Sequence, residues 1–534
     1  MLRTWTGGRA ATRLLVAGVT LGALVAAAPA VSASTGGYQA PGGPVAGTAN
    51  GAVRGESIGP VSEFLGIPYA APPVGALRWQ PPQPAANWSG VRDATQFAPH
   101  CPQLASPFGQ ASTSEDCLFL NVFTPSHRQA GVMGARSPVM VWIHGGALVT
   151  GESNDYSPTK LVEDGVTVVT INYRLGALGF LAQPALADAN GQSGDYGLMD
   201  QQAALRWVQR NIASFGGDPR NVTIFGESAG GLSVLSQVAS PAARGLFAKA
   251  IAESGSYNLT QASLASAEAA GQAFAAKAGC EDQTAACLRS LPVSTILASE
   301  DAAGYTPNIN TEVLPQTLKT AFTTGEFNRV PVINGTNHDE WRLFVALSEL
   351  EGGGPVTAAN YQPMISSTLG VPASAAAAIA AEYPLSAYPS PAVALGAVGT
   401  DAIFACPALT IDQAVSNFVP TFAYEFNDEN APENFLPQLS FPYGAAHATE
   451  IQYLMDLPDV AFPGTLSAPQ QQLATIMKDY WTHFAERGFP SSFGTPVWPR
   501  FDQVTQQIQS LVPPTPQTET DFTATHKCAF WAAA

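Results

Sequence analysis

Charged residues are scarce in this chain of 534 residues, and basic residues are scarcest. Asp, Glu, Lys and Arg together make up 12% of the sequence, and 24 basic residues face 41 acidic ones, which gives a formal net charge of −17. A polyanion such as nucleic acid would be repelled by this charge, so a nucleic-acid-binding function is excluded. With 46% hydrophobic residues, the low charge also excludes a disordered chain and predicts a large packed core.

Metal-binding motifs are also missing. The sequence has no CxxC or HExxH pattern, and its seven histidines are scattered. Because structural and catalytic metal sites usually show such spacings, we expect no metal. The chain also lacks an internal repeat and a long polar linker.

A long uncharged apolar run occurs at the N-terminus. Arg3, Arg9 and Arg13 precede the run 14–28, and small residues follow it. This pattern predicts a secretory signal peptide over residues 1–33, cleaved after Ala30 or Ala33, and hence a secreted protein. The alternative, a membrane anchor, is disfavoured because a span needs about 20 apolar residues. We find no later stretch long and apolar enough to span a bilayer, so we expect no stable membrane anchor.

The predicted export bears on the six cysteines, because thiols oxidise outside the cytoplasm. An even number of cysteines then indicates disulfides rather than metal ligands. Sequence alone permits fifteen pairings. Pairing of neighbours along the chain would close two short loops and one long loop, joining Cys101 to Cys117, Cys280 to Cys287, and Cys406 to Cys528.

Short apolar runs alternate with helical patterns from about residue 61 onward, which is typical of strand-helix-strand units. Leu198, Leu205, Val208 and Ile212 have helical spacing. The pattern predicts an α/β fold with a mostly parallel central sheet flanked by helices. Residues 352–398, rich in Ala, Gly, Ser and Pro, are expected to form helices and loops that cover the sheet. The predicted central strands are 139–143, 166–171, 222–225 and 330–333.

The most informative segment is Gly226-Glu227-Ser228-Ala229-Gly230, which lies between a predicted strand and a predicted helix. This is the GxSxG pattern in the context where it forms a nucleophile elbow. The glycines permit a sharp turn that lifts the Ser228 hydroxyl above the sheet edge. Ser228 is therefore the candidate nucleophile.

A nucleophilic serine needs amide donors for the oxyanion that forms during acyl transfer. The segment His144-Gly145-Gly146-Ala147 follows a predicted strand and supplies a glycine-bearing loop. The predicted oxyanion hole consists of the backbone amides of Gly146, Ala147 and Ala229.

In this arrangement the acid and the histidine follow the serine in the chain. Glu340 and His447 each lie in a loop after a predicted strand, and they are the candidates. Asp339 is the rival acid, which position alone does not separate from Glu340, and His338 is the rival base. His447 would accept the Ser228 proton, so activity should fall on acidification through a pKa near ~6–7.

In these motifs and in the segments given below, the chain resembles the type-B carboxylesterases, which include cholinesterases, bile-salt-activated lipases and bacterial nitrobenzyl esterases. The resemblance implies an α/β-hydrolase fold, with helical and loop insertions over the active site, in a single domain over residues 34–534. It implies cofactor-free hydrolysis of a small-molecule or lipid-like carboxylic ester. The matching segments are 64–70, 72–75, 115–125, 215–230 and 528–531.

The resemblance also implies roles for single residues. It assigns the acid to Glu340 rather than Asp339, and it places His447 in a His-x-x-Glu motif. Glu227 and Ser254 would help to order the hydrogen bonds of the site. The three neighbour pairings of cysteines correspond to family disulfides. Ion pairs of Arg78 with Glu115 and of Arg174 with Asp200 match positions that pair in relatives.

Two departures concern the pocket. Ala147 stands where many relatives have a third glycine, and Leu148 stands where an aromatic residue is common. The first change keeps the amide donor but narrows the space beside the acyl carbon. Two alternatives to an esterase stay open: a lipase or polyester hydrolase with the same mechanism, and a non-catalytic binding or adhesion protein on this scaffold. The sequence does not indicate the oligomeric state.

Overall fold

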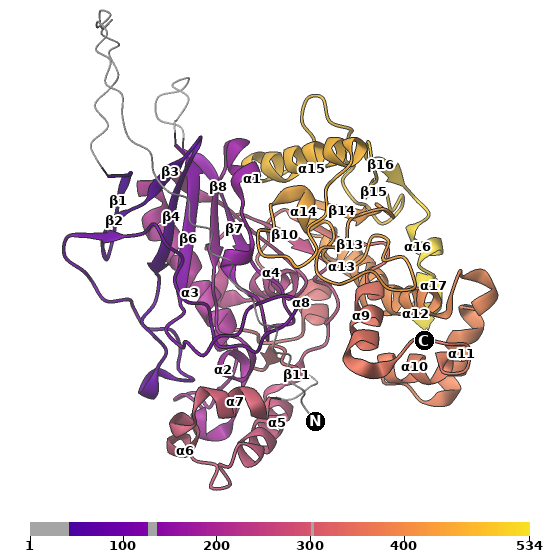
Figure 1. The fold of residues 1–534 in the computed structure, drawn as a ribbon, viewed down its shortest axis with the longest axis horizontal. Helices are drawn as coiled ribbons and strands as arrows, with labels where there is room; N and C mark the ends of the chain where they lie inside the picture. The colour runs from indigo at the N-terminus through magenta and orange to yellow at the C-terminus, as the bar shows by residue number, and fades with distance from the viewer. Residues whose placement is uncertain (1–41, 127–135, 301–303, 534) are drawn as a thin grey trace, which may run out of the picture. The chain divides into compact units, whose positions relative to one another are not determined.

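The centre of the protein is a large mixed β-sheet, seen in a computed structural model that describes residues 42–126, 136–300 and 304–533 (Figure 1). The predicted signal peptide lies outside these residues. Within them, eleven strands join in the order β16-β15-β14-β13-β10-β9-β7-β8-β6-β4-β3. These strands are β3 (Glu56–Ile58), β4 (Val61–Pro68), β6 (Phe119–Pro125), β7 (Ser137–Ile143), β8 (Thr167–Ile171), β9 (Gly217–Glu227), β10 (Lys249–Glu253), β13 (Val332–Asn337), β14 (Thr421–Phe426), β15 (Ile508–Leu511) and β16 (Gln517–Glu519).

The middle of this sheet is parallel, from β8 through β7, β9, β10, β13 and β14 to β15. The two margins are antiparallel, with β3, β4 and β6 on one side and β16 on the other. The predicted α/β fold with a mostly parallel sheet is therefore confirmed. Smaller sheets are formed by β1 (Val45–Thr48), β2 (Gly51–Arg54) and β5 (Val91–Asp93), and by β11 (Ala262–Ser263) and β12 (Asn308–Ile309).

Helices follow most of the central strands. The helix predicted from the spacing of Leu198, Leu205 and Val208 is α3. The described α-helices are α1 (Thr159–Glu163), α2 (Gly176–Phe180), α3 (Tyr196–Asn211), α4 (Ala229–Ala239), α5 (Leu264–Lys277), α6 (Ala285–Ser290), α7 (Val293–Ser299), α8 (Leu318–Thr324), α9 (Trp341–Ser348), α10 (Tyr361–Leu369), α11 (Ala373–Glu382), α12 (Pro391–Gly399), α13 (Cys406–Val415), α14 (Ile451–Leu454), α15 (Ala468–Arg487), α16 (Phe522–Thr525) and α17 (Cys528–Ala533).

The central strands of the sheet are buried on both faces, and the apolar strand β7 illustrates this. Along β7, Val139, Val141 and Ile143 join one apolar cluster, whereas Met140 and Trp142 join another. Since successive side chains of a strand point to opposite faces, these clusters are the two layers of the core. Helices α3 and α4 contribute to the first cluster, and α14 and α15 contribute to the second. Because the sheet is packed on both faces, the ends of its strands are held in place, and the site described below lies at these ends.

One prediction about membrane spans is wrong. Residues Pro391–Val415 form a continuous helical run, α12, the π-helix η8 (Thr400–Ala405) and α13, that is long and apolar enough to cross a bilayer. In this fold, however, 78% of its apolar window is buried inside the protein. The helix is apolar on all sides because it packs within the core, as expected of a buried helix of a large protein. The sequence pattern missed it because Thr400, Asp401 and Cys406 interrupt the run.

Three disulfides join Cys101 to Cys117, Cys280 to Cys287, and Cys406 to Cys528. These are the pairings that the resemblance implies. The third bridge spans 122 residues and joins α13 to α17, next to the sheet. The expected ion pairs are also present, with Arg78 Nη2 2.5 Å from Glu115 Oε2 and Arg174 Nε 2.7 Å from Asp200 Oδ2.

Candidate active site

Ser228 lies in a strained turn between β9 and α4. Its φ and ψ angles are 56° and −120°, a conformation that non-glycine residues rarely adopt. The turn is tight enough that a Cβ atom added to Gly226 or Gly230 would lie 2.4 Å or 1.9 Å from the carbonyl oxygen of Ile143. The Ser228 amide donates to Glu253 O on the neighbouring strand at 2.9 Å. The GxSxG segment thus adopts the elbow geometry that the sequence predicts.

The loop after β7 runs beside this elbow. Gly146, Ala147 and Leu148 all have positive φ angles, and the Val149 and Thr150 amides hold the loop by donating to Gly146 O. Among the described residues, the amides of Gly146, Ala147 and Ala229 have no hydrogen-bond acceptor. Ala229 opens α4, so its amide belongs to the free donors at a helix N-terminus. These three free donors are the ones that the sequence assigns to the oxyanion hole.

His447 is held by Glu340. Its Nδ1 atom lies 2.5 Å from Glu340 Oε2, and both side chains are buried. Glu340 follows β13, where its Oε1 atom accepts hydrogen bonds from Thr336 Oγ1 at 2.7 Å and from the Asn337 amide at 2.8 Å. These bonds fix the carboxylate and therefore the orientation of the imidazole ring. Among the described residues, His447 Nε2 has no hydrogen-bond partner.

The rival residues are engaged elsewhere. Asp339 Oδ1 lies 2.7 Å from Arg342 Nη2, and Asp339 Oδ2 accepts a hydrogen bond from the Ala445 amide at 3.0 Å. His338 contacts Asp339 through Nδ1 at 3.1 Å. Position in the sequence could not separate Asp339 from Glu340, but the structure places only Glu340 against His447.

Glu227 approaches the other side of the His447 ring, with 3.2 Å between Glu227 Oε1 and His447 Nε2. Burial alone would lower the pKa of His447, but the negative charges of Glu227 and then Glu340 outweigh it and raise that pKa to about 9. This exceeds the value of ~6–7 expected from the sequence. The difference arises because the sequence pattern does not reveal how many carboxylates surround the ring.

The carboxyl groups of Glu227, Glu253 and Glu450 are buried close to one another. Burial raises the pKa of Glu227 well above its ordinary value, and nearby Glu450 and Glu340 add to the effect. Burial, together with Glu450, raises the pKa of Glu253 to about 8, and burial, together with Glu340, raises that of Glu450 to about 7. Sequence reasoning missed Glu253 and Glu450 as site residues, although Glu450 ends the His-x-x-Glu motif. Asn337 connects Glu450 to the site by donating from Nδ2 to its Oε2 at 2.6 Å.

Ser254 contacts the neighbouring strand through its backbone. Its amide donates to Gly335 O at 3.0 Å, but its buried hydroxyl has no partner among the described residues. Glu253, the residue before it, accepts a hydrogen bond from Trp481 Nε1 at 2.7 Å instead.

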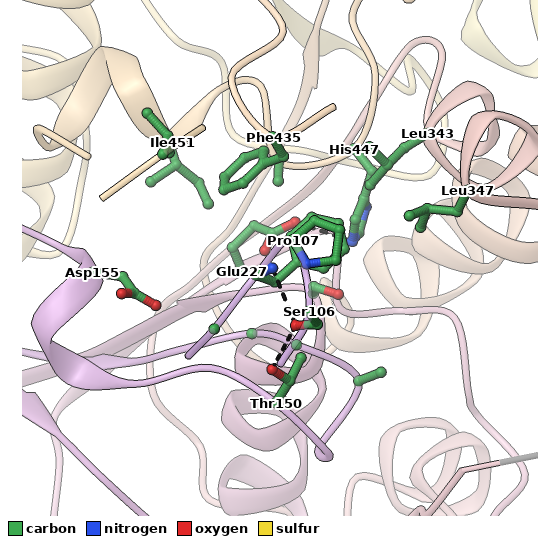
Figure 2. A pocket seen from close by; sticks show the side chains of 18 of the residues that line it. Ser106, Pro107, Thr150, Asp155, Glu227, Leu343, Leu347, Phe435, His447 and Ile451 are labelled. Carbon is green, nitrogen blue, oxygen red and sulfur yellow. Dashed lines mark hydrogen bonds and ion pairs between the residues drawn. The ribbon is translucent and has the colours of Figure 1, made fainter. Parts of the chain in front are cut away.

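Ser228, His447 and Glu227 line a cavity of about 330 Å³ together with Gly146 and Ala147. Figure 2 shows Leu343 and Leu347 on the same side of this cavity as His447, and Asp155 on the opposite side. Ser106 and Thr150 hydrogen-bond through their hydroxyls at 2.8 Å in the wall below. No Lys or Arg lines the cavity in the described part of the chain. Its apolar lining side chains include Phe108, Leu343, Phe344, Leu347, Phe435, Ile451, Leu457 and Val460.

The comparisons with known proteins agree with this geometry. The sequence profile described as the carboxylesterase family matches residues 39–531. The chain is 35% identical to the acylcarnitine hydrolase of Mus musculus, covering 88% of each protein, and 35% identical to the cocaine esterase of Homo sapiens, covering 86% of this chain and 85% of the relative. It is also 35% identical to the fumonisin B1 esterase of Sphingopyxis macrogoltabida, covering 85% of this chain and 84% of the relative.

Proposed function

This chain belongs to the carboxylesterase family and is a carboxylic ester hydrolase, and on that premise we propose that it cleaves esters through an acyl-enzyme on Ser228, with Glu340 and His447 completing the triad. The observation that carries the proposal is the contact between His447 Nδ1 and Glu340 Oε2 beside the cavity that Ser228 lines, while Nε2 makes no hydrogen bond to another described residue. No specific contact favours the binding-protein alternative.

In the proposed reaction, His447 Nε2 removes the hydroxyl proton of Ser228 as Oγ attacks the ester carbonyl carbon. The carbonyl oxygen becomes an oxyanion, which the amides of Gly146, Ala147 and Ala229 stabilise. His447 then protonates the leaving alcohol. In the second half, His447 activates a water molecule that attacks the acyl-enzyme, and the acid leaves as Ser228 regains its proton. Glu340 holds the ring in the correct tautomer and stabilises the imidazolium.

We further propose that the protein is secreted and that residues 34–534 are a single domain. The three disulfides favour an oxidising compartment. Residues 42–533 pack as one compact unit, which supports the single domain. The predicted signal peptide supplies the route of export.

Hydrolysis of a p-nitrophenyl ester series, from acetate to palmitate, tests the proposed activity. Labelling by a fluorophosphonate, followed by mass spectrometry of the peptides, tests the nucleophile. We expect hydrolysis of at least the short esters and an adduct on the peptide that contains Ser228. A preference for palmitate at a lipid interface would favour the lipase alternative, and a folded chain that neither hydrolyses nor labels would refute the proposal.

The pH dependence of kcat/KM is expected to follow the neutral form of His447. Only the neutral ring accepts a proton, so kcat/KM should rise with pH and level off near the pKa of about 9. Below that midpoint the rate should fall about tenfold per pH unit. The rates are measured with phenyl butyrate by chromatography of the released phenol.

A Glu227→Gln variant provides the matched control for this profile. It removes the negative charge that contributes most to raising the pKa of His447, so the midpoint should move to lower pH. A midpoint that is unchanged by Glu227→Gln would argue against His447 as the titrating base.

Esters with a negatively charged acyl group are expected to be poor substrates. Burial, and then the charges of Glu152 and Asp459, raise the pKa of Asp155 in the cavity wall to about 8, which shows that this region disfavours negative charge. In the described lining no Lys or Arg side chain could pair with a substrate carboxylate. We expect kcat/KM for phenyl hydrogen adipate to be at least about tenfold below that for phenyl hexanoate.

A Glu351→Lys variant is the control for this prediction, because it replaces a carboxylate of the cavity wall with a cation. The gap between the two esters should become smaller in this variant. Equal rates for the two esters in the unmodified protein would contradict the prediction.

A further inference from the structure

Two histidines that are far apart in the sequence meet beside Glu425. His338 follows β13, Glu425 lies on β14, and His526 lies between α16 and α17. One ring nitrogen of each histidine and one carboxylate oxygen of Glu425 all lie within 4.8 Å of one another. The two rings meet edge to face, with 5.5 Å between their centroids. These residue types at this spacing are those that bind a divalent transition metal.

Both rings are oriented by an aspartate. His338 Nδ1 lies 3.1 Å from Asp339 Oδ1, and His526 Nδ1 lies 2.6 Å from Asp401 Oδ1. Histidines that bind a metal usually donate their other ring N–H to a carboxylate in this way, which fixes the tautomer and the ring orientation. Nε2 is then the atom of each ring that a metal ion would take, and that of His526 already contacts Glu425.

The two aspartates are themselves held by further hydrogen bonds. Asp339 accepts from Arg342 and from the Ala445 amide. Asp401 Oδ2 accepts from the Tyr383 hydroxyl at 2.7 Å, and that hydroxyl accepts from Trp531 Nε1 at 2.7 Å. The orientation of both histidine rings is therefore built into the fold.

The third residue, Glu425, adds negative charge in a buried place. His526 Nε2 lies 2.6 Å from Glu425 Oε1, and both side chains are 3% exposed. The carboxyl group of Glu519 on β16 lies next to that of Glu425. The Oε1 atom of Glu519 is buried and has no hydrogen-bond partner among the described residues. Two carboxyl groups this close in a buried place repel each other when both are ionised, and a bound cation would offset that repulsion.

We propose that His338, His526 and Glu425 bind a zinc ion, with Glu519 or a water molecule as the fourth ligand. Zn–N and Zn–O distances of about 2.0–2.2 Å place tetrahedral ligand atoms roughly 3.3–3.5 Å apart. The contact between His526 Nε2 and Glu425 therefore widens by less than about 1 Å, and His338 moves inward by up to about 1.5 Å. On binding, the ion takes the place of the proton that His526 shares with Glu425, and this proton is released to solvent.

The position of the site indicates its role. None of the three ligands lines the cavity of Ser228. His338 precedes Glu340 by two residues, and His526 precedes Cys528 by two residues. A bound ion therefore links the loop that carries the acid to the C-terminal segment and stabilises the fold without taking part in hydrolysis. The side chain of His338 is 28% exposed, which gives the ion a route from solvent.

The test uses the full-length purified protein and does not depend on its hydrolytic activity. The protein is treated with a chelator, dialysed against ZnCl₂ and then against buffer, and its zinc content is measured by mass spectrometry. We expect one zinc per chain and a melting temperature that rises with zinc concentration, since an ion that binds only the native state stabilises it. With CoCl₂, we expect the visible absorption bands of tetrahedral cobalt.

The variant His338→Gln keeps a polar side chain at a partly exposed position and should fold, which its disulfides and circular dichroism would verify. It should lose the bound zinc and the cobalt spectrum. His483→Gln, on α15, is the matched control and should keep both. A zinc content well below one per chain in the unmodified protein, or unchanged zinc in His338→Gln, would overturn the proposal and leave the cluster as an ion-pair network only.

Discussion

Replacing Ser228 by alanine is expected to lower kcat by about a million-fold. The change removes the oxygen that forms the acyl-enzyme, while the amides of Gly146, Ala147 and Ala229 stay in place to support a small residual rate. Because Ser228 donates no side-chain hydrogen bond to another described residue, its loss should not unfold the protein. Initial rates with phenyl butyrate, together with the melting temperature, measure the effect.

Ser266→Ala is the control for this experiment, since Ser266 is exposed on α5. It should retain full activity. If the Ser228→Ala protein kept more than about one thousandth of the parent rate, another nucleophile would have to carry the reaction.

Replacing Glu340 by glutamine is expected to lower kcat by about 10⁴-fold. Glutamine keeps the size of the side chain but carries no charge, and its amide can donate to His447 Nδ1, which favours the wrong tautomer of the ring. The imidazolium that forms during the reaction also loses its counter-charge. Single-turnover and steady-state rates on phenyl butyrate measure the loss.

Asp339→Asn is the matched control for the acid. It weakens the contact of Asp339 with Arg342, so it should lower the melting temperature, but it should retain activity within about tenfold of the parent. A reversal of the two results, with Asp339→Asn nearly inactive and Glu340→Gln active, would assign the acid to Asp339.

The parts of the site that depend on local sequence could be predicted from it. Gly226 and Gly230 are needed because a side chain at either position would collide with Ile143, and this requirement is visible as the GxSxG pattern. The mostly parallel sheet was also predictable, because strands buried on both faces are continuous apolar runs. The disulfide pairing needed more than the number of cysteines, and it was the resemblance to the family that selected it.

The parts that depend on side-chain direction and on distant neighbours could not be predicted. Asp339 and Glu340 are adjacent, and the contacts of Asp339 with Arg342 and with the Ala445 amide hold it away from His447. The pKa of His447 depends on Glu227 and Glu340, which the fold brings to the ring from separate segments. For the same reason, the scattered histidines gave no sign that His338 and His526 lie together.

The order of the strands has a consequence for protein synthesis. Ser228, Glu340 and His447 are all synthesised before α15, β15 and β16. At that stage β14 has an unpaired edge, the second apolar cluster lacks the side chains of α15, and Cys406 has no partner. An incomplete sheet cannot fix the loops that hold Glu340 and His447. We therefore expect chains that end before α15 to lack ester hydrolase activity.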